Sequence, residues 1–347
     1  MNSILDHITV LDFTRLLPGP LATHMLAQMG ANVIKVERTP TSDFLKHQPP
    51  FVDERSTLDR ALNTLKTVWE INFSTPEGKQ QILEKVKDVD VVIEQFRPGI
   101  MQKWGLGFEE LKAIKPDLIY ISLSGYGQTG PMAQEAGHDI NYLANAGILD
   151  MIRDDNGKPI IPGVQIADIA SGSYLTLSAC LTALIGRSKD AKAQYIDVSM
   201  LNGLVPLLTI PISQEWGGLS ANMLKILHGG LVNYNVYEAK DGRWIALGAL
   251  ELKFWNNFCE LGDRLDWKRS SQLELSVMTF PKNEVEALFK SKTQAEWVEL
   301  AQDQDICLSA VLKLEELEAQ KQLQHYEMLD SSNGMINLPF RWGNILD

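Results

Sequence analysis

Residues 8–131 repeat a strand-and-helix order, and this order restricts the fold more than any other feature of the chain. Residues 8–14 (ITVLDFT) and 32–38 (NVIKVER) have the apolar pattern of short strands, and residues 19–31 between them have the pattern of a helix. Segments 77–99 and 107–131 each place a helix before a strand. Strands that alternate with helices indicate a parallel sheet covered by helices. We therefore predict an α/β fold with a doubly wound, mostly parallel sheet.

Ligands of such sheets gather at the carboxyl ends of the strands, so the residues that end each apolar run are candidates for a binding site. These residues are Thr14, Arg15, Glu37, Arg38, Gln95, Arg97 and 124–128. The three arginines predict an anion site, and the alternative for each is an ordinary solvent-exposed side chain. Neither GxGxxG nor GxxxxGK occurs, so the sequence supports neither a dinucleotide fingerprint nor a phosphate-binding P-loop.

The alternation changes near residue 188, which predicts two domains. We expect a large α/β domain formed by residues 1–187 with 311–347, a linker at 188–214, and a smaller α+β domain at 215–310. Within the smaller domain, YNVYEAKDGRWIALGAL (234–250) predicts a hairpin with Asp241 and Gly242 at its turn.

The charge of the chain restricts its partners. Lys and Arg total 32 against 44 Asp and Glu, a net charge of -12, which disfavours nucleic acid or an anionic membrane. The three cysteines are widely spaced, so no disulfide framework or metal cluster is predicted, and we expect a cytoplasmic protein. The apolar run 175–186 is too short to span a bilayer and predicts a buried helix.

Two segments carry side chains suited to acid–base chemistry. In AGHDINYLANAG (136–147), His138 is either a base or simply the residue before a helix capped by Asp139. Asp168 precedes an apolar helix and suits an N-cap position. The small residues 170–173 after it allow either close approach of a ligand or tight helix packing. Glu251 by itself is typical of a solvated surface group.

Six segments occur in an order that resembles the class III CoA-transferase superfamily, which includes the α-methylacyl-CoA racemases. They are VLDFTRLLPGPLATHMLAQMGANVIKVERTP (10–40), RPGIMQKWGLGFEELKAIKPDLIYISLSGYGQTGP (97–131), AGHDINYLANAGIL (136–149), IADIASGSYLTLSACLTALIGR (166–187), AQYIDVSMLNG (193–203) and VYEAKDGRWIALGALELKFW (236–255). The resemblance covers nearly the whole chain.

This resemblance implies a homodimer whose two chains interlock, with each active site between the large domain of one chain and the small domain of the other. It implies that Asp168 is the nucleophile of a transferase or an acid/base group of a racemase. The racemases add a histidine, matched by His138, and a carboxylate that supports it, matched by Glu251. The balance favours a racemase.

For the acyl-CoA ligand, the resemblance assigns Arg38 and Arg97 to the phosphates, with Lys66 as a weaker match. Asp139 and Tyr142 are further candidates for binding this ligand, and the backbone N–H of Asp139, in the first turn of its helix, is a candidate donor to the enolate oxygen. The basic Asn-Arg-x-Lys-Arg-Ser stretch of relatives is absent here, where LNTLK stands instead. Residues 223, 224 and 227 (Met, Leu and Leu) are candidates for an acyl channel or for ordinary packing.

Inverting the carbon next to a thioester requires one group to remove a proton and another to return one to the opposite face. We expect His138 with Glu251, and Asp168, to do this on 2-methyl-branched acyl-CoA without a metal or any cofactor beyond CoA itself. The alternatives are a CoA-transferase that uses Asp168 as nucleophile and an inactive acyl-CoA-binding dimer.

Overall fold

The computed structural model describes residues 3–40, 43–154, 156–187, 192–218, 226–276 and 280–341. They form two compact units, the large unit with residues 1–208 and 321–347 and the small unit with residues 209–320. Met223 and Leu224, two of the candidate channel residues, lie outside the described residues.

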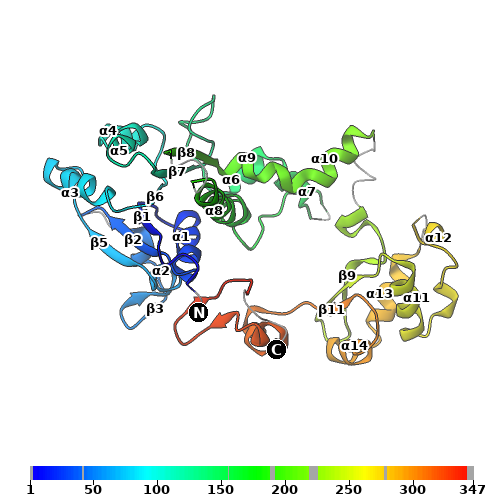
Figure 1. Cartoon of the computed structure of the whole chain (residues 1–347). Coiled ribbons are helices and arrows are strands. Elements are labelled where there is room, and N and C mark those ends of the chain that lie inside the picture. The colour runs from blue at the N-terminus through cyan, green and yellow to red at the C-terminus, as the bar shows by residue number, and fades with distance from the viewer. Residues whose placement is uncertain are drawn as a thin grey trace. The chain divides into compact units, whose positions relative to one another are not determined.

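A six-stranded sheet in the order β5-β2-β1-β6-β7-β8 forms the centre of the large unit (Figure 1). Its strands are β1 (Thr9–Asp12), β2 (Asn32–Glu37), β5 (Thr67–Glu70), β6 (Val91–Glu94), β7 (Ile119–Ser124) and β8 (Gln194–Ser199). Every neighbouring pair is parallel, with Leu11 of β1 opposite both Ile34 and Val92. The predicted parallel sheet is confirmed. The chain proceeds from β1 to one side and then returns to the other, so the topological switch lies between β1 and β6.

Both faces of this sheet are buried, because successive side chains of its strands alternate between two apolar cores. Val10 belongs to one core and Leu11 to the other, as do Val91 and Val92. The first core includes residues of α1 (Pro18–Gln28), α6 (Asp139–Asn145), α7 (Ile148–Met151), α8 (Leu175–Arg187) and α9 (Met200–Leu204). The second includes residues of α3 (Pro76–Val86), α4 (Ile100–Lys103) and α5 (Phe108–Ile114).

The remaining parts of the large unit are short. They are η1 (Phe44–His47), β3 (Phe51–Val52), β4 (Arg55–Ser56), α2 (Thr57–Asn63), η3 (Val205–Leu208), α15 (Lys321–His325), β12 (Leu329–Asp330) and β13 (Met335–Ile336). Arg60 of α2 donates to the carbonyl oxygens of Ser332 at 2.7 Å and Asn333 at 2.9 Å. These bonds hold the β12–β13 hairpin against α2.

The small unit has its own core around a three-stranded antiparallel sheet in the order β11-β10-β9. Its elements are α10 (Thr209–Trp216), η5 (Ile226–Gly230), β9 (Tyr234–Glu238), β10 (Trp244–Gly248), α11 (Leu252–Leu261), η6 (Leu265–Trp267), α12 (Gln272–Ser276), α13 (Lys282–Phe289), α14 (Gln294–Ala301), β11 (Leu308–Ala310) and η7 (Leu314–Ala319). The predicted hairpin is confirmed, since β9 pairs with β10 and Gly242 in the turn has a φ of 75°.

The predicted linker at 188–214 is wrong for its described residues. It contains β8, which pairs with β7 from Gln194 to Ser199, and α9. β8 is an edge strand, and the side chains in its first half alternate between partly buried and exposed. This alternation gave the segment the polar sequence pattern expected of a linker. The return to the large unit also comes later than the expected residue 311, at Lys321.

The helix expected at 175–186 is longer than predicted. A π-helical stretch, η2 (Ala167–Tyr174), continues directly into α8, which gives an apolar helix from Ala167 to Arg187 that by length and composition alone would suffice to cross a membrane. The length argument against a span therefore fails. The predicted burial is confirmed for one face, where Leu177, Cys180 and Ala183 belong to the first core.

Candidate active site

A cavity of about 410 Å³ lies at the carboxyl ends of β1, β2 and β6, where the topological switch places a ligand site. It is lined by Phe13, Thr14, Arg15, Lys35, Val36, Glu37, Arg38, Asp43, Phe73, Gln95, Phe96, Arg97, Ile100 and Trp104. The strand ends expected to hold an anion are thus brought together, and all three arginines line the same cavity. Residues 124–128 are not part of its lining.

Aromatic rings form a wall of this cavity and support two of its arginines. Phe96 and Trp104 meet edge to face with ring centres 5.0 Å apart. The Arg15 guanidinium lies 5.2 Å from the centre of the Phe96 ring, and that of Arg38 lies 5.7 Å from Trp104. Such contacts hold a guanidinium while leaving its N–H groups able to bind oxygen atoms. The sequence pattern did not predict these aromatic residues, although Phe96 directly precedes Arg97.

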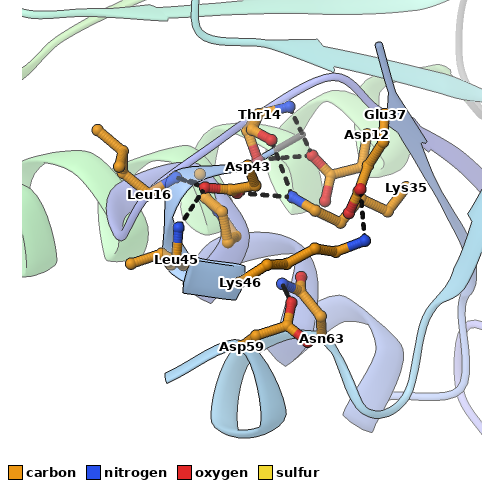
Figure 2. A network of polar contacts seen from close by, with 12 residues as sticks. Asp12, Thr14, Leu16, Lys35, Glu37, Asp43, Leu45, Lys46, Asp59 and Asn63 are labelled. Carbon is orange, nitrogen blue, oxygen red and sulfur yellow. Dashed lines mark hydrogen bonds and ion pairs between the residues drawn. The ribbon is translucent and has the colours of Figure 1, made fainter. Parts of the chain in front are cut away.

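A polar network that includes residues of the cavity lining is shown in Figure 2. Asp43 accepts from the Lys35 ammonium at 3.2 Å, and this pair is almost completely buried. The same carboxylate accepts from the backbone N–H of Leu16 at 3.2 Å. Leu16 has a φ of 62°, which is strained for a bulky residue and needs support from its surroundings. Asp43 thereby fixes the loop that carries Arg15.

Lys66 belongs to the interior of the protein. Its ammonium donates to Asp12 Oδ2 at 3.1 Å, to Thr23 Oγ1 at 2.7 Å and to the Pro20 carbonyl at 2.8 Å. The side chains of Lys66 and Asp12 are both 0% exposed. Burial lowers the pKa of Lys66 to about 8, which leaves it charged at neutral pH. All three N–H donors are engaged, so the structure revises the assignment of Lys66 to phosphate binding.

His138 occupies the N-cap position of α6, and Asp139 is the first helical residue. The N-cap residue is therefore His138, one residue before the Asp139 that the sequence suggested. The backbone N–H of His138 donates to Asn141 Oδ1 at 3.1 Å, and the His138 side chain is exposed. Its imidazole is accessible to a ligand.

Tyr142 anchors the backbone that precedes His138. Its hydroxyl donates to the Gly137 carbonyl at 2.7 Å. A Cβ atom on Gly137 would lie 2.7 Å from Tyr142 Cε1 and 2.8 Å from Tyr126 Oη, so glycine lets the chain rest on these rings. The Tyr142 side chain is buried, and burial raises its pKa to about 12. Its hydroxyl is thus committed to positioning the loop.

Asp168 is the second residue of η2, whose N-cap position is Ile166. The sequence-based N-cap reading of Asp168 is therefore wrong. Its backbone N–H donates to Asp139 Oδ1 at 3.0 Å. Burial, and then the charge of Asp139, raise the pKa of Asp168 to about 6, while His138 acts in the opposite direction. The structure thus brings His138, Asp139 and Asp168 together, and a π-helical turn is itself common at functional sites.

The small residues that follow Asp168 pack tightly. A Cβ atom on Gly172 would lie 2.6 Å from Pro18 Cβ and 3.3 Å from Met200 Sδ. Ser173 Oγ donates to the Pro18 carbonyl at 2.7 Å. Of the two readings of this stretch, these contacts support helix packing against α1 and α9.

The cavity and Asp168 are linked through α1 and Tyr142. Gln95 lines the cavity, and its side-chain oxygen accepts from the Gly19 N–H at 3.1 Å. Gly19 follows Pro18, whose carbonyl accepts from the Ser173 hydroxyl. The charges of both Asp168 and Arg97 act on the hydroxyl of Tyr142. The cavity and the region around His138 and Asp168 are therefore connected within the large unit.

Glu251 lies in the small unit, at the N-cap position of α11, and its side chain is exposed. It makes no side-chain cap bond. Its position relative to His138 stays a prediction.

Comparison with known proteins identifies the family to which the chain is similar. The model of the family described as CoA-transferase family III matches residues 5–340. Human succinyl-CoA:glutarate CoA-transferase is 31% identical over 98% of this chain and 80% of its own length. Human alpha-methylacyl-CoA racemase is 33% identical over 90% of this chain and 79% of its own length. Racemases and transferases are thus similar to the chain to the same degree.

Among solved structures, a CAIB/BAIF family protein from Brucella suis superposes with a TM-score of 0.84 at 27% identity. The match covers 99% of this chain and 94% of that protein. The similarity therefore extends over the complete α/β fold and both units.

Proposed function

Since the chain belongs to CoA-transferase family III, we propose that it is an acyl-CoA racemase that inverts the α-carbon of 2-methyl-branched acyl-CoA thioesters. The observation that carries this proposal is the pairing of His138 with Asp168. His138 at the N-cap of α6 and Asp168 in η2 lie close enough for the charge of His138 to act on the pKa of Asp168. A two-base inversion needs such a pair.

In this mechanism one residue removes the α-proton and the other delivers its proton to the opposite face of the enolate. The thioester carbonyl holds the negative charge between the two transfers. Asp168, with its pKa raised to about 6, is a stronger base when ionised than an ordinary aspartate and a usable acid when protonated. The exposed His138 provides the second group.

We propose that the cavity holds the phosphate part of CoA. Arg15, Arg38 and Arg97 line it, and the guanidinium fork suits phosphate oxygens. Arg97 also acts electrostatically on Tyr142, which anchors the His138 loop. The charge of Arg97 thus reaches from the cavity to the residue that anchors the His138 loop. The proposed reaction needs no metal or further cofactor.

We further propose a homodimer in which Glu251 of one copy supports His138 of the other. Co-expression of a His138→Ala chain with a Glu251→Gln chain tests this. In a mixed dimer, one site then combines both defects and the other has neither. Recovery of activity above that of each single variant supports the proposal, and no recovery contradicts it.

Proton NMR in deuterium oxide tests the reaction itself, with (2R)- and (2S)-2-methylacyl-CoA as separate substrates. The wild-type protein should remove the α-proton signal of both and convert each toward a mixture. His138→Gln and Asp168→Asn should each retain exchange from only one enantiomer, and the two variants should differ in which one. Exchange from both enantiomers by either variant would contradict the two-base assignment.

A CoA-transferase is the second candidate, because succinyl-CoA:glutarate CoA-transferase is similar over 98% of the chain. Here the Asp168 carboxylate attacks the thioester carbonyl, CoA leaves as thiolate, and an acyl anhydride forms. The thiolate then attacks the aspartyl carbonyl and releases the acid, which leaves a CoA thioester on Asp168. Borohydride or hydroxylamine would mark this residue, as mass spectrometry detects. An unmodified Asp168 together with α-proton exchange favours the racemase, and CoA binding without any turnover favours the inactive dimer.

A further inference from the structure

Asp139 is the chain neighbour of His138 and the hydrogen-bond partner of Asp168. It follows His138 directly in the chain and begins α6. Its carboxylate accepts the backbone N–H of Asp168 at 3.0 Å, although the two residues are 29 positions apart. No other side chain among the described residues is bonded to this N–H in the structure. A single carboxylate thus joins the start of α6 to the turn that carries Asp168.

The Asp168 N–H needs such an acceptor because of its place in η2. The first N–H groups of a helix have no partner within that helix. The next residue, Ile169, donates to the Gln165 carbonyl at 3.1 Å, whereas Asp168 finds its acceptor on another helix. Farther along, the Ser173 hydroxyl is 3.2 Å from the Asp168 carbonyl. The Asp168 backbone is therefore held at its N–H by Asp139, while the Ser173 hydroxyl gives its proton to the nearer Pro18 carbonyl.

The charge of Asp139 also acts on the Asp168 carboxyl. Burial is the larger cause of the raised pKa of Asp168, Asp139 adds to it, and His138 opposes it. Tyr142 on α6 also interacts with Asp168. The packed elements α1, α8 and β8 carry the titratable residues His24, Cys180, Arg187, Tyr195 and Asp197, none of which contributes to this shift. Asp139 is thus the one carboxylate, among the described residues, that opposes ionisation of Asp168.

We propose that Asp139 is a positioning residue for the reaction: its carboxylate fixes the Asp168 backbone and places a second negative charge beside the Asp168 side chain. The first effect sets where the Asp168 carboxyl lies. The second keeps its proton available near neutral pH. This inference rests on the proposed function only in that Asp168 takes part in the chemistry.

Two substitutions separate these effects. Asp139→Asn keeps an oxygen that can accept the Asp168 N–H but removes the charge, and Asp139→Ala removes both. Glu135→Gln is the matched control, because it removes one negative charge from the exposed loop just before α6, at a residue that does not act on Asp168.

In the direction in which Asp168 removes the α-proton, the acidic limb of the pH profile of kcat should move to lower pH in Asp139→Asn and Asp139→Ala and stay in place in Glu135→Gln. The kcat of Asp139→Ala at its own optimum should also fall about five- to ten-fold below that of Asp139→Asn, the value of one hydrogen bond, with KM nearly unchanged. An unmoved limb in Asp139→Asn would contradict the electrostatic effect. Equal kcat in the two variants would contradict the backbone effect.

A titration without turnover separates this inference from the proposed function. Carbon-13 NMR of protein labelled at the aspartate carboxyl carbon, with Asp168→Asn to identify the resonance, follows the ionisation of Asp168. Its midpoint should lie near pH 6 in the wild type and lower in Asp139→Asn. An unchanged midpoint would overturn the inference, whereas absence of α-proton exchange by the wild type would overturn only the racemase.

Discussion

The variant Lys66→Met tests whether Lys66 stabilises the protein interior through a buried ion pair or binds phosphate, as the resemblance implied. Lys66 and Asp12 form an ion pair at 3.1 Å with both side chains 0% exposed. Removing one partner of such a pair leaves a buried charge and typically costs about 3–5 kcal/mol of folding free energy. Asp12 keeps three other donors, the Thr14 N–H and the hydroxyls of Thr14 and Thr23. We therefore expect a loss near the lower value, about 3 kcal/mol.

A loss of about 3 kcal/mol lowers the Tm of a domain of this size by roughly 6–12 °C. Calorimetry measures this change, and Lys112→Met is the matched control. Lys112 is paired with Glu109 at 2.8 Å, but its side chain is 42% exposed, so its removal should cost less than about 1 kcal/mol.

The stability loss should shrink at low pH. Burial alone would raise the pKa of Asp12, but Lys66, Lys35 and the two threonine hydroxyls outweigh it and hold that pKa below its ordinary value. The pair therefore stabilises the folded protein above about pH 4, and this contribution is lost as pH falls further.

Affinity for CoA, measured by calorimetric titration of the folded variant, should stay within about two-fold of wild type, since no phosphate contact is removed. A Tm within about 2 °C of wild type, combined with affinity at least about ten-fold weaker, would refute the internal role and restore Lys66 to the phosphate site.

Three other predictions follow from the site. Burial and Asp139 raise the pKa of Asp168 to about 6, so the stability tied to its protonated form is present below about pH 4 and lost as pH rises through 6. The free energy of unfolding of Asp168→Asn, measured with denaturant, should therefore exceed that of wild type by about 1–2 kcal/mol at pH 7.5 and equal it at pH 4. Gly137→Ala places a Cβ atom 2.7 Å from the Tyr142 ring and should lower kcat at least about ten-fold by moving His138, whereas Gly163→Ala, with nothing within 4 Å, should leave kcat unchanged. Arg97→Ala should weaken CoA binding about 10- to 100-fold in calorimetric titration, as expected for a lost charged hydrogen bond; unchanged affinity would remove Arg97 from the phosphate site.

Local pattern was sufficient to predict the parallel sheet and the positions of its strand ends. Residues 8–14 and 32–38 have strand periodicity with a helix between them, and parallel order places their carboxyl ends at one edge. Arg15, Arg38 and Arg97 then converge for topological reasons. The β9–β10 hairpin was equally predictable, because Gly242 suits a turn with positive φ.

Interactions between distant segments were beyond local pattern. Asp168 is of a residue type that often serves as an N-cap, yet in the structure its own backbone N–H donates to the carboxylate of Asp139 in a different helix. Lys66 looks like a free cation in the sequence, and only the burial of Asp12 beside it shows an internal ion pair. Likewise, nothing near Asp43 in the sequence indicates that it holds Leu16 and Lys35.

The most direct test of the central claim is α-proton exchange in deuterium oxide, followed by proton NMR, with each enantiomer of a 2-methylacyl-CoA. We expect loss of the α-proton signal from both enantiomers with wild-type protein, from one enantiomer with His138→Gln, and from the opposite enantiomer with Asp168→Asn. If the wild-type protein is folded and binds CoA but exchanges the α-proton of neither enantiomer, racemase chemistry at His138 and Asp168 is contradicted.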